Sequence, residues 1–164
     1  MLFDSFNKPK KISQIDALDR KILNLLSDNS RRKLIDIARE LGLSIPSTKA
    51  RIGRLVDEKI ITRFTIHADT EKTGMPIGVH VRVKLNKITE ARQNEFIAHL
   101  KKNKNVIDIF SIIGQYDLLL VVIAESSTEI NKILFKIRHD FTDIISDWET
   151  NYIMEIYKLE EYSY

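Results

Sequence analysis

The spacing of two short amphipathic segments around Gly42 constrains the fold of this chain more than any other feature. Residues 33–41 place apolar side chains on one helical face, and Gly42 suits the left-handed turn that ends a helix. Ser44 is an N-cap residue for a second helix, in whose first turn Pro46 is tolerated. Two helices joined by a short turn containing glycine are typical of the helix-turn-helix, whose second helix enters the major groove of DNA.

The second helix, expected over residues 44–59, has an outer face suited to a polyanion. Its inward stripe is predicted to comprise Ile45, Thr48, Ile52, Leu55 and Val56. The opposite stripe comprises Ser47, Ala50, Arg51, Arg54 and Asp57. Small residues between two arginines allow a groove to approach closely while the guanidinium groups reach phosphates or guanine edges. A basic helix face is also common on purely solvated surfaces, so this helix alone does not establish DNA binding.

The distribution of charge supports a contact between the first part of the chain and nucleic acid. The net charge of the chain is +3. Residues 1–63 contain 14 Lys and Arg against 8 Asp and Glu, whereas residues 64–164 contain 12 against 15. A basic first part and an acidic second part are expected when one part meets DNA and the other meets protein or a small ligand.

Composition also excludes several classes of protein. The chain has no cysteine, so disulfides and thiolate metal sites are excluded. No apolar run approaches the ~18 residues of a membrane span, and the first residues have no apolar core of a signal peptide. We therefore expect a soluble cytoplasmic protein without membrane contact.

Helices and one strand are expected around the helix-turn-helix. Residues 1–13 are polar and basic, which predicts a flexible arm, and residues 16–29 show helical periodicity. Residues 60–68 are rich in β-branched side chains, which predicts a strand that serves as a wing or a linker. The polar stretch 69–76 contains glycine and proline and predicts a domain boundary.

The second half of the chain alternates strands and helices. Residues 77–85 alternate apolar and polar side chains, and residues 118–124 are apolar throughout, as in a central strand. The remaining elements are expected as a helix capped by Thr89, a strand over 106–113, a helix over 126–141 and a strand over 144–158. This βαββαβ order predicts a ferredoxin-like antiparallel sheet with both helices on one side.

The predicted fold is therefore α+β, with an N-terminal winged helix-turn-helix and a C-terminal βαββαβ ligand-binding and oligomerisation domain. We place the arm at 1–13, the DNA-binding domain at 14–62, a linker strand and hinge at 63–75, and the βαββαβ domain at 76–164. Apolar side chains on both faces of the sheet require a cover, and the simplest is a second copy across a two-fold axis.

Two stretches resemble the Lrp/AsnC, or feast/famine, family of transcription regulators. Residues 18–61 (LDRKILNLLSDNSRRKLIDIARELGLSIPSTKARIGRLVDEKII) resemble its helix-turn-helix, and residues 112–126 (IIGQYDLLLVVIAES) resemble the glycine-x-x-aspartate hairpin of its amino-acid-binding module. The resemblance covers nearly all of residues 15–158. It implies dimers formed through the C-terminal sheets, often joined into tetramers or octamers, that bind a palindromic site in double-stranded DNA.

The resemblance also implies specific contact residues. For DNA these are Ser47, Lys49, Ala50, Arg51 and Arg54. For an amino acid or related small metabolite, bound between dimers, they are Gly114, Tyr116 and Asp117, with Thr150 as a further contact. Turn amides at Gly114 could bind the carboxylate of an amino acid and Asp117 its ammonium group, but both residues are also ordinary turn formers.

Two alternatives stay open from the sequence. Some tetrapyrrole (siroheme-type) decarboxylases share this architecture, but the histidines show no metal-ligand spacing and no nucleotide-binding or nucleophile motif appears, so we expect no enzyme activity and no cofactor. His80 with Arg82 is the one pair that fits such an enzyme. The second alternative is a ligand-independent architectural DNA-binding protein, which its salt dependence and specificity would distinguish.

Overall fold

The computed structural model describes residues 15–159 and 161–164, so the predicted arm at 1–13 lies outside the described residues. The chain divides into two compact units. Unit 1 contains the residues up to His67 together with the segment Lys158–Tyr164, and unit 2 is Ala68–Tyr157. By their contacts, residues 158–164 thus group with the unit of the helix-turn-helix, although they follow the βαββαβ elements in sequence.

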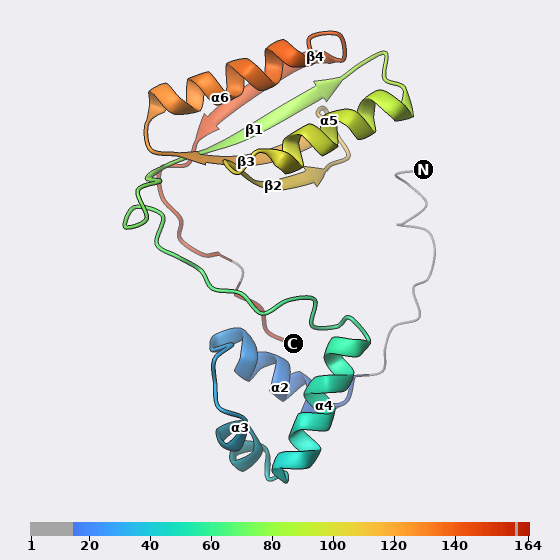
Figure 1. Cartoon of the computed structure of the whole chain (residues 1–164), viewed down its shortest axis with the longest axis vertical. Helices are drawn as coiled ribbons and strands as arrows, with labels where there is room; N and C mark the ends of the chain where they lie inside the picture. The colour runs from blue at the N-terminus through green and yellow to red at the C-terminus, as the bar shows by residue number, and fades with distance from the viewer. Residues whose placement is uncertain (1–14, 160) are drawn as a thin grey trace. The chain divides into compact units, whose positions relative to one another are not determined.

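The described part of unit 1 contains three helices, α2 (Ala17–Asp28), α3 (Leu34–Leu41) and α4 (Ile45–Asp57) (Figure 1). The turn between α3 and α4 is the predicted one, because Gly42 adopts a left-handed conformation with φ of 66°. Ser44 caps α4 by accepting a hydrogen bond from the backbone N–H of Ser47. The helices enclose a small apolar core formed by Ile22, Leu23, Ile37 and Leu55.

The predicted strand at residues 60–68 is absent from the described structure. Residues 60–68 are not assigned to any strand, and the side chains of Phe64 and Ile66 are exposed. β-Branched residues favour extended backbone, but a strand also requires a neighbour that accepts and donates its backbone hydrogen bonds. The sequence pattern indicates extended backbone at these residues, but it does not show whether a neighbouring strand is present.

Unit 2 has the predicted βαββαβ order. Its elements are β1 (Ile77–Leu85), α5 (Glu90–Lys102), β2 (Val106–Ser111), β3 (Leu118–Ala124), α6 (Ser127–Asp140) and β4 (Ile145–Tyr152). The sheet order is β2-β3-β1-β4 and every pair is antiparallel. Both helices cover one face of this sheet, which confirms the α+β fold and the central position of β3 (Figure 1).

The register of the sheet shows which residues lie on the face covered by the helices and which lie on the uncovered face. Val81 of β1 lies opposite Leu120 of β3 and Thr150 of β4, on the face that packs against the helices. Arg82 lies opposite Leu119 and Glu149, on the face that the helices leave uncovered. β4 ends at residue 152, six residues before the predicted end, because the segment beyond it leaves the ladder.

Candidate DNA interface and ligand-binding turn

The outer face of α4 presents three of the five residues predicted to contact DNA. Ser47, Lys49 and Ala50 are exposed, whereas Thr48 and Leu55 are buried beneath them. These exposed residues adjoin a shallow hollow on α4, lined by Pro46, Lys49, Ala50, Gly53, Arg54, Asp57 and Glu58. A helix face of small side chains around a lysine permits close approach to a phosphate backbone.

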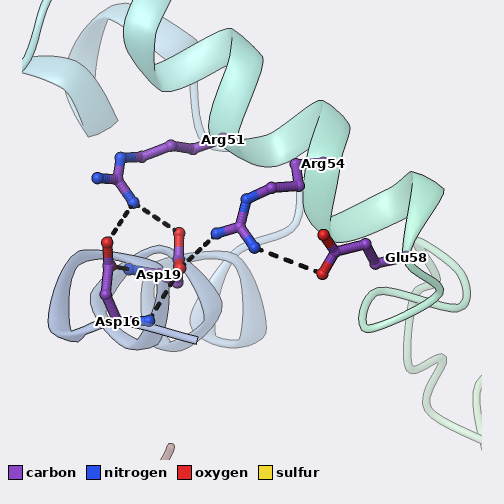
Figure 2. A network of polar contacts seen from close by, with 5 residues as sticks. All are labelled: Asp16, Asp19, Arg51, Arg54 and Glu58. Carbon is purple, nitrogen blue, oxygen red and sulfur yellow. Dashed lines mark hydrogen bonds and ion pairs between the residues drawn. The ribbon is translucent and has the colours of Figure 1, made fainter. Parts of the chain in front are cut away.

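The buried stripe of α4 differs from the predicted one. Ile45 and Val56 were expected to face inward, but they are 45% and 40% exposed. Arg51 and Arg54, which were expected to face outward, instead turn their guanidinium groups toward α2 (Figure 2). The helix is therefore rotated relative to the prediction, so that Arg51 and Arg54 contact α2.

Arg51 and Arg54 form an ion-pair network with the start of α2 (Figure 2). Arg51 donates to Asp16 at 2.7 Å and to Asp19 at 2.9 Å, and Arg54 donates to Asp19 and, at 3.4 Å, to Glu58. Asp19 is completely buried, so its charge requires these partners. Two residues predicted to bind DNA thus hold the recognition helix against α2.

The same carboxylates cap α2. Asp16 accepts a hydrogen bond from the backbone N–H of Asp19 at 2.8 Å, and Asp19 accepts one from the backbone N–H of Asp16 at 3.0 Å. Burial opposes the charge on Asp19, but the Asp16 N–H and the two guanidinium groups outweigh it and hold the pKa of Asp19 below its usual value. Sequence reasoning missed this network, although a carboxylate within the apolar stripe of a helix is a signal for a buried ion pair.

In unit 2, the turn between β2 and β3 places Gly114, Tyr116 and Asp117 close together. Gly114 is exposed, and its φ of 153° lies in a region that side chains disfavour. Within the described part of the chain, the backbone amides of residues 113–116 have no hydrogen-bond acceptor. Such amides are suited to an anionic group of a ligand.

Asp117 is occupied within its own chain. Its carboxylate accepts a hydrogen bond from the backbone N–H of Leu85 at 2.8 Å and lies 3.3 Å from the ammonium group of Lys84. Its own backbone N–H donates to the carbonyl oxygen of Val83. These bonds join the start of β3 to β1 at the bulge between Lys84 and Leu85. The structure therefore gives Asp117 a role in holding the turn.

Tyr116 brings two further acidic residues to the turn. Its hydroxyl lies 3.5 Å from the carboxylate of Asp147, and a hydrogen bond to Glu149 together with burial raises the pKa of Tyr116. Glu149 also pairs with Arg82 across the uncovered face of the sheet at 3.2 Å. Sequence reasoning missed Asp147 and Glu149, because their approach to the turn depends on the pairing of β4 with β1.

Thr150 does not join this group. It lies on the helix-covered face of the sheet, where its hydroxyl accepts a hydrogen bond of 3.0 Å from the indole N–H of Trp148. Successive residues of a strand point to opposite faces, so Glu149 faces the Tyr116 side and Thr150 faces away from it. One chain therefore brings together three of the four residues predicted to bind an effector.

Comparison with protein-family models identifies both units. A winged helix-turn-helix DNA-binding model matches residues 15–62, and the model of the Lrp/AsnC ligand binding domain matches residues 78–162, more than half of the chain. The chain belongs to the Lrp/AsnC family. It is a DNA-binding transcription regulator of the Lrp/AsnC type.

Curated relatives and solved structures agree with this membership. The proline dehydrogenase transcriptional activator of Rhizobium radiobacter is 33% identical over 112 residues, which cover 68% of this chain and 72% of that protein. An uncharacterised HTH-type transcriptional regulator of Pyrococcus horikoshii is 28% identical over 120 residues, which cover 73% of this chain and 80% of that protein. Both relatives are named as regulators of transcription.

Two solved structures show the same fold. A transcriptional regulator of Neisseria meningitidis in complex with L-Met has a TM-score of 0.82 and 20% identity, and the match covers 89% of this chain and 94% of that chain. AsnC of Escherichia coli has a TM-score of 0.77 and 22% identity, with 90% and 97% covered. The Lrp/AsnC architecture therefore extends over both units.

The described residues contain neither a metal-binding cluster nor a membrane-spanning helix. Among those residues, no group of three or more His, Cys, Asp or Glu side chains is arranged to hold a metal ion. None of the helices in the described part of the chain is long and apolar enough to span a membrane.

Proposed function

We propose that this Lrp/AsnC regulator binds a palindromic promoter site as a dimer or higher homo-oligomer in the cytoplasm, and that an amino acid or a related metabolite controls this binding. The observation that carries the proposal is the presence, in one chain, of an exposed recognition helix and a ligand-binding domain with an open glycine turn. The L-Met complex of the Neisseria regulator supports an amino acid as the class of ligand.

The DNA contact is assigned to the exposed face of α4. Ser47 and Ala50 are small enough for the helix to approach the groove, and Lys49 supplies a positive charge for a phosphate. Arg51 and Arg54 hold α4 in position through their ion pairs with Asp19. Arg54 also lines the hollow and adds to the positive charge of the exposed face. Two copies related by a two-fold axis would place two such helices on the two halves of a palindrome.

The uncovered face of the sheet supports assembly from two copies. Leu119, Val121 and Ile123 of β3 are only half-buried there, and Phe110 of β2 is 48% exposed. A row of apolar side chains on the middle of a sheet is stabilised when a second surface removes it from water. A second copy of the same sheet supplies such a surface in a self-complementary way.

The effector is assigned to the turn at residues 113–117. The unpaired turn amides suit the carboxylate of an amino acid, and the carboxylates of Asp147 and Glu149 suit its ammonium group. Asp117 positions the turn, since its oxygens already bind Lys84 and Leu85. Thr150 contacts the effector only if, in the assembly, the helix-covered face of one copy lies next to the turn at residues 113–117 of another copy.

Thermal unfolding against the twenty amino acids, with sedimentation of any hit, tests the proposal, because a ligand that binds only the folded state raises its melting temperature. We expect a hit that is lost when Asp147→Asn and Glu149→Gln are combined, and retained in the control Glu155→Gln, whose side chain is exposed elsewhere. Specific promoter binding without any hit would instead indicate a ligand-independent regulator or another metabolite.

A further inference from the structure

The polypeptide passes between the two units twice. It leaves unit 1 after His67, forms unit 2, and returns to unit 1 at Lys158. The returning segment, residues 158–164, contains Leu159, Tyr162 and Tyr164, and the two tyrosine rings stack at a centroid distance of 5.9 Å. Unit 1 is therefore built from two separate stretches of sequence.

A reciprocal pair of hydrogen bonds attaches the returning segment to α2. The backbone N–H of Tyr164 donates to the side-chain oxygen of Asn24 at 2.9 Å, and the side-chain amide of Asn24 donates to the carbonyl oxygen of Tyr164 at 3.4 Å. An asparagine side chain can satisfy both backbone groups of one residue because it carries a donor and an acceptor. Asn24 lies about two helical turns after the N-cap residue Asp16 of α2.

The attachment lies in a groove that both connections share. The groove is lined by the second half of α2, by the loop after it, by residues 60–67 and by the returning segment. Ser30 of the loop donates a hydrogen bond of 3.1 Å to the carbonyl oxygen of Thr65, so the outgoing connection is fixed here as well. The apolar side chains of Leu23 and Leu26 line the groove, and the side chains of Tyr162 and Tyr164 line it as well.

We propose that the α2 side of this groove is a docking site for residues 158–159 and 161–164 of the same chain, and that both connecting segments are thereby held within unit 1. The segment supplies one pair of backbone groups to Asn24, and its leucine and tyrosine side chains line the groove together with Leu23 and Leu26 of α2. When both connecting segments are attached to unit 1, their conformational freedom is lower than when only one is attached. This docking role is independent of which DNA or ligand the protein binds.

Photo-crosslinking tests where the segment binds. Tyr164→p-benzoyl-phenylalanine keeps an aromatic ring and the backbone groups that contact Asn24. We expect the crosslink in a peptide from residues 23–31, in a product that migrates as a single chain on a denaturing gel. The same substitution at Tyr157, which is 88% exposed, should give no crosslink to that peptide. A product of two chains, or no crosslink to residues 23–31, overturns the proposal.

Hydrogen exchange tests whether the docking stabilises α2. In a variant that ends at Tyr157, amides of α2 should exchange about thirtyfold faster, as expected when two hydrogen bonds of ordinary net strength are lost. Amides of α5 in unit 2 should be unchanged and serve as the internal control. Asn24→Ala in the full chain removes only the reciprocal pair and should change α2 in the same direction. Unchanged exchange of α2 in both variants would overturn the proposal.

Discussion

The buried carboxylate of Asp19 in α2 accepts a hydrogen bond of 2.9 Å from the guanidinium group of Arg51 in α4. Asp19 also accepts one from Arg54, so a single carboxylate joins the first helix of unit 1 to two successive turns of the recognition helix. Ion pairs of this kind require defined geometry, unlike apolar contacts. The exposed face of α4 is therefore fixed by α2.

Replacing Asp19 by Asn should destabilise unit 1 by about 3 kcal/mol, because it leaves two guanidinium groups without their buried carboxylate. Urea unfolding monitored by circular dichroism measures the change. Asp57→Asn, an exposed position on α4, is the control and should change stability by less than about 0.5 kcal/mol. An Asp19 variant as stable as this control would mean that the network contributes nothing.

Acid should weaken unit 1 through the same carboxylate. The pKa of Asp19 is lower in the folded than in the unfolded state, so its contribution is fully present above the unfolded value of about 3.9 and is lost as the pH falls through the folded value. Asp16, whose pKa is lowered chiefly by the backbone N–H of Asp19, acts in the same direction. Urea unfolding between pH 7 and pH 2 should therefore show a steeper loss below pH 4 for the native chain than for Asp19→Asn.

Lys49→Gln should weaken DNA binding about tenfold and lower the slope of log affinity against log salt by about 1 for each bound copy, because a phosphate contact is lost. Fluorescence anisotropy with a promoter fragment at several salt concentrations measures both. Lys21→Gln, on the exposed face of α2, removes the same charge from unit 1 and should leave the slope unchanged. Equal slopes for the native chain and Lys49→Gln would exclude this lysine from the interface.

Two glycine substitutions should have opposite effects on stability. Gly114→Ala should destabilise unit 2 by about 1 kcal/mol, because its φ of 153° disfavours a side chain although the space around it is open. Gly53→Ala, within α4 and also without neighbours at its Cβ position, should stabilise unit 1 by about 0.7 kcal/mol. Thermal unfolding of the two variants checks both signs. Stabilisation by Gly114→Ala would show that the turn relaxes easily.

Local patterns were sufficient for most of the fold. The strand Ile77–Leu85 and the apolar strand Leu118–Ala124 have the predicted bounds, because alternation and continuous burial are both visible within one stretch of sequence. Thr89 caps its helix as predicted, since a cap depends on residues only three positions apart. Gly42 ends α3 for a similarly local reason.

The remaining features depend on residues that are distant in sequence. Arg51 and Arg54 turn inward because Asp19, more than thirty residues earlier, is buried beside them. Thr150 lies away from the Gly114 turn because of the pairing between β4 and β1, which helical or strand periodicity does not reveal. A sequence pattern therefore predicted which residues share an element, but not which partners those residues meet across elements.

The return of residues 158–164 to unit 1 also fixes an order of events during protein synthesis. Helices α2, α3 and α4 emerge first, but the last piece of their unit is made about 100 residues after His67, and at ~5–20 residues per second this takes roughly 5–20 s. Unit 2 is translated within that interval. Unit 1 is therefore complete only after the ligand-binding domain has been synthesised.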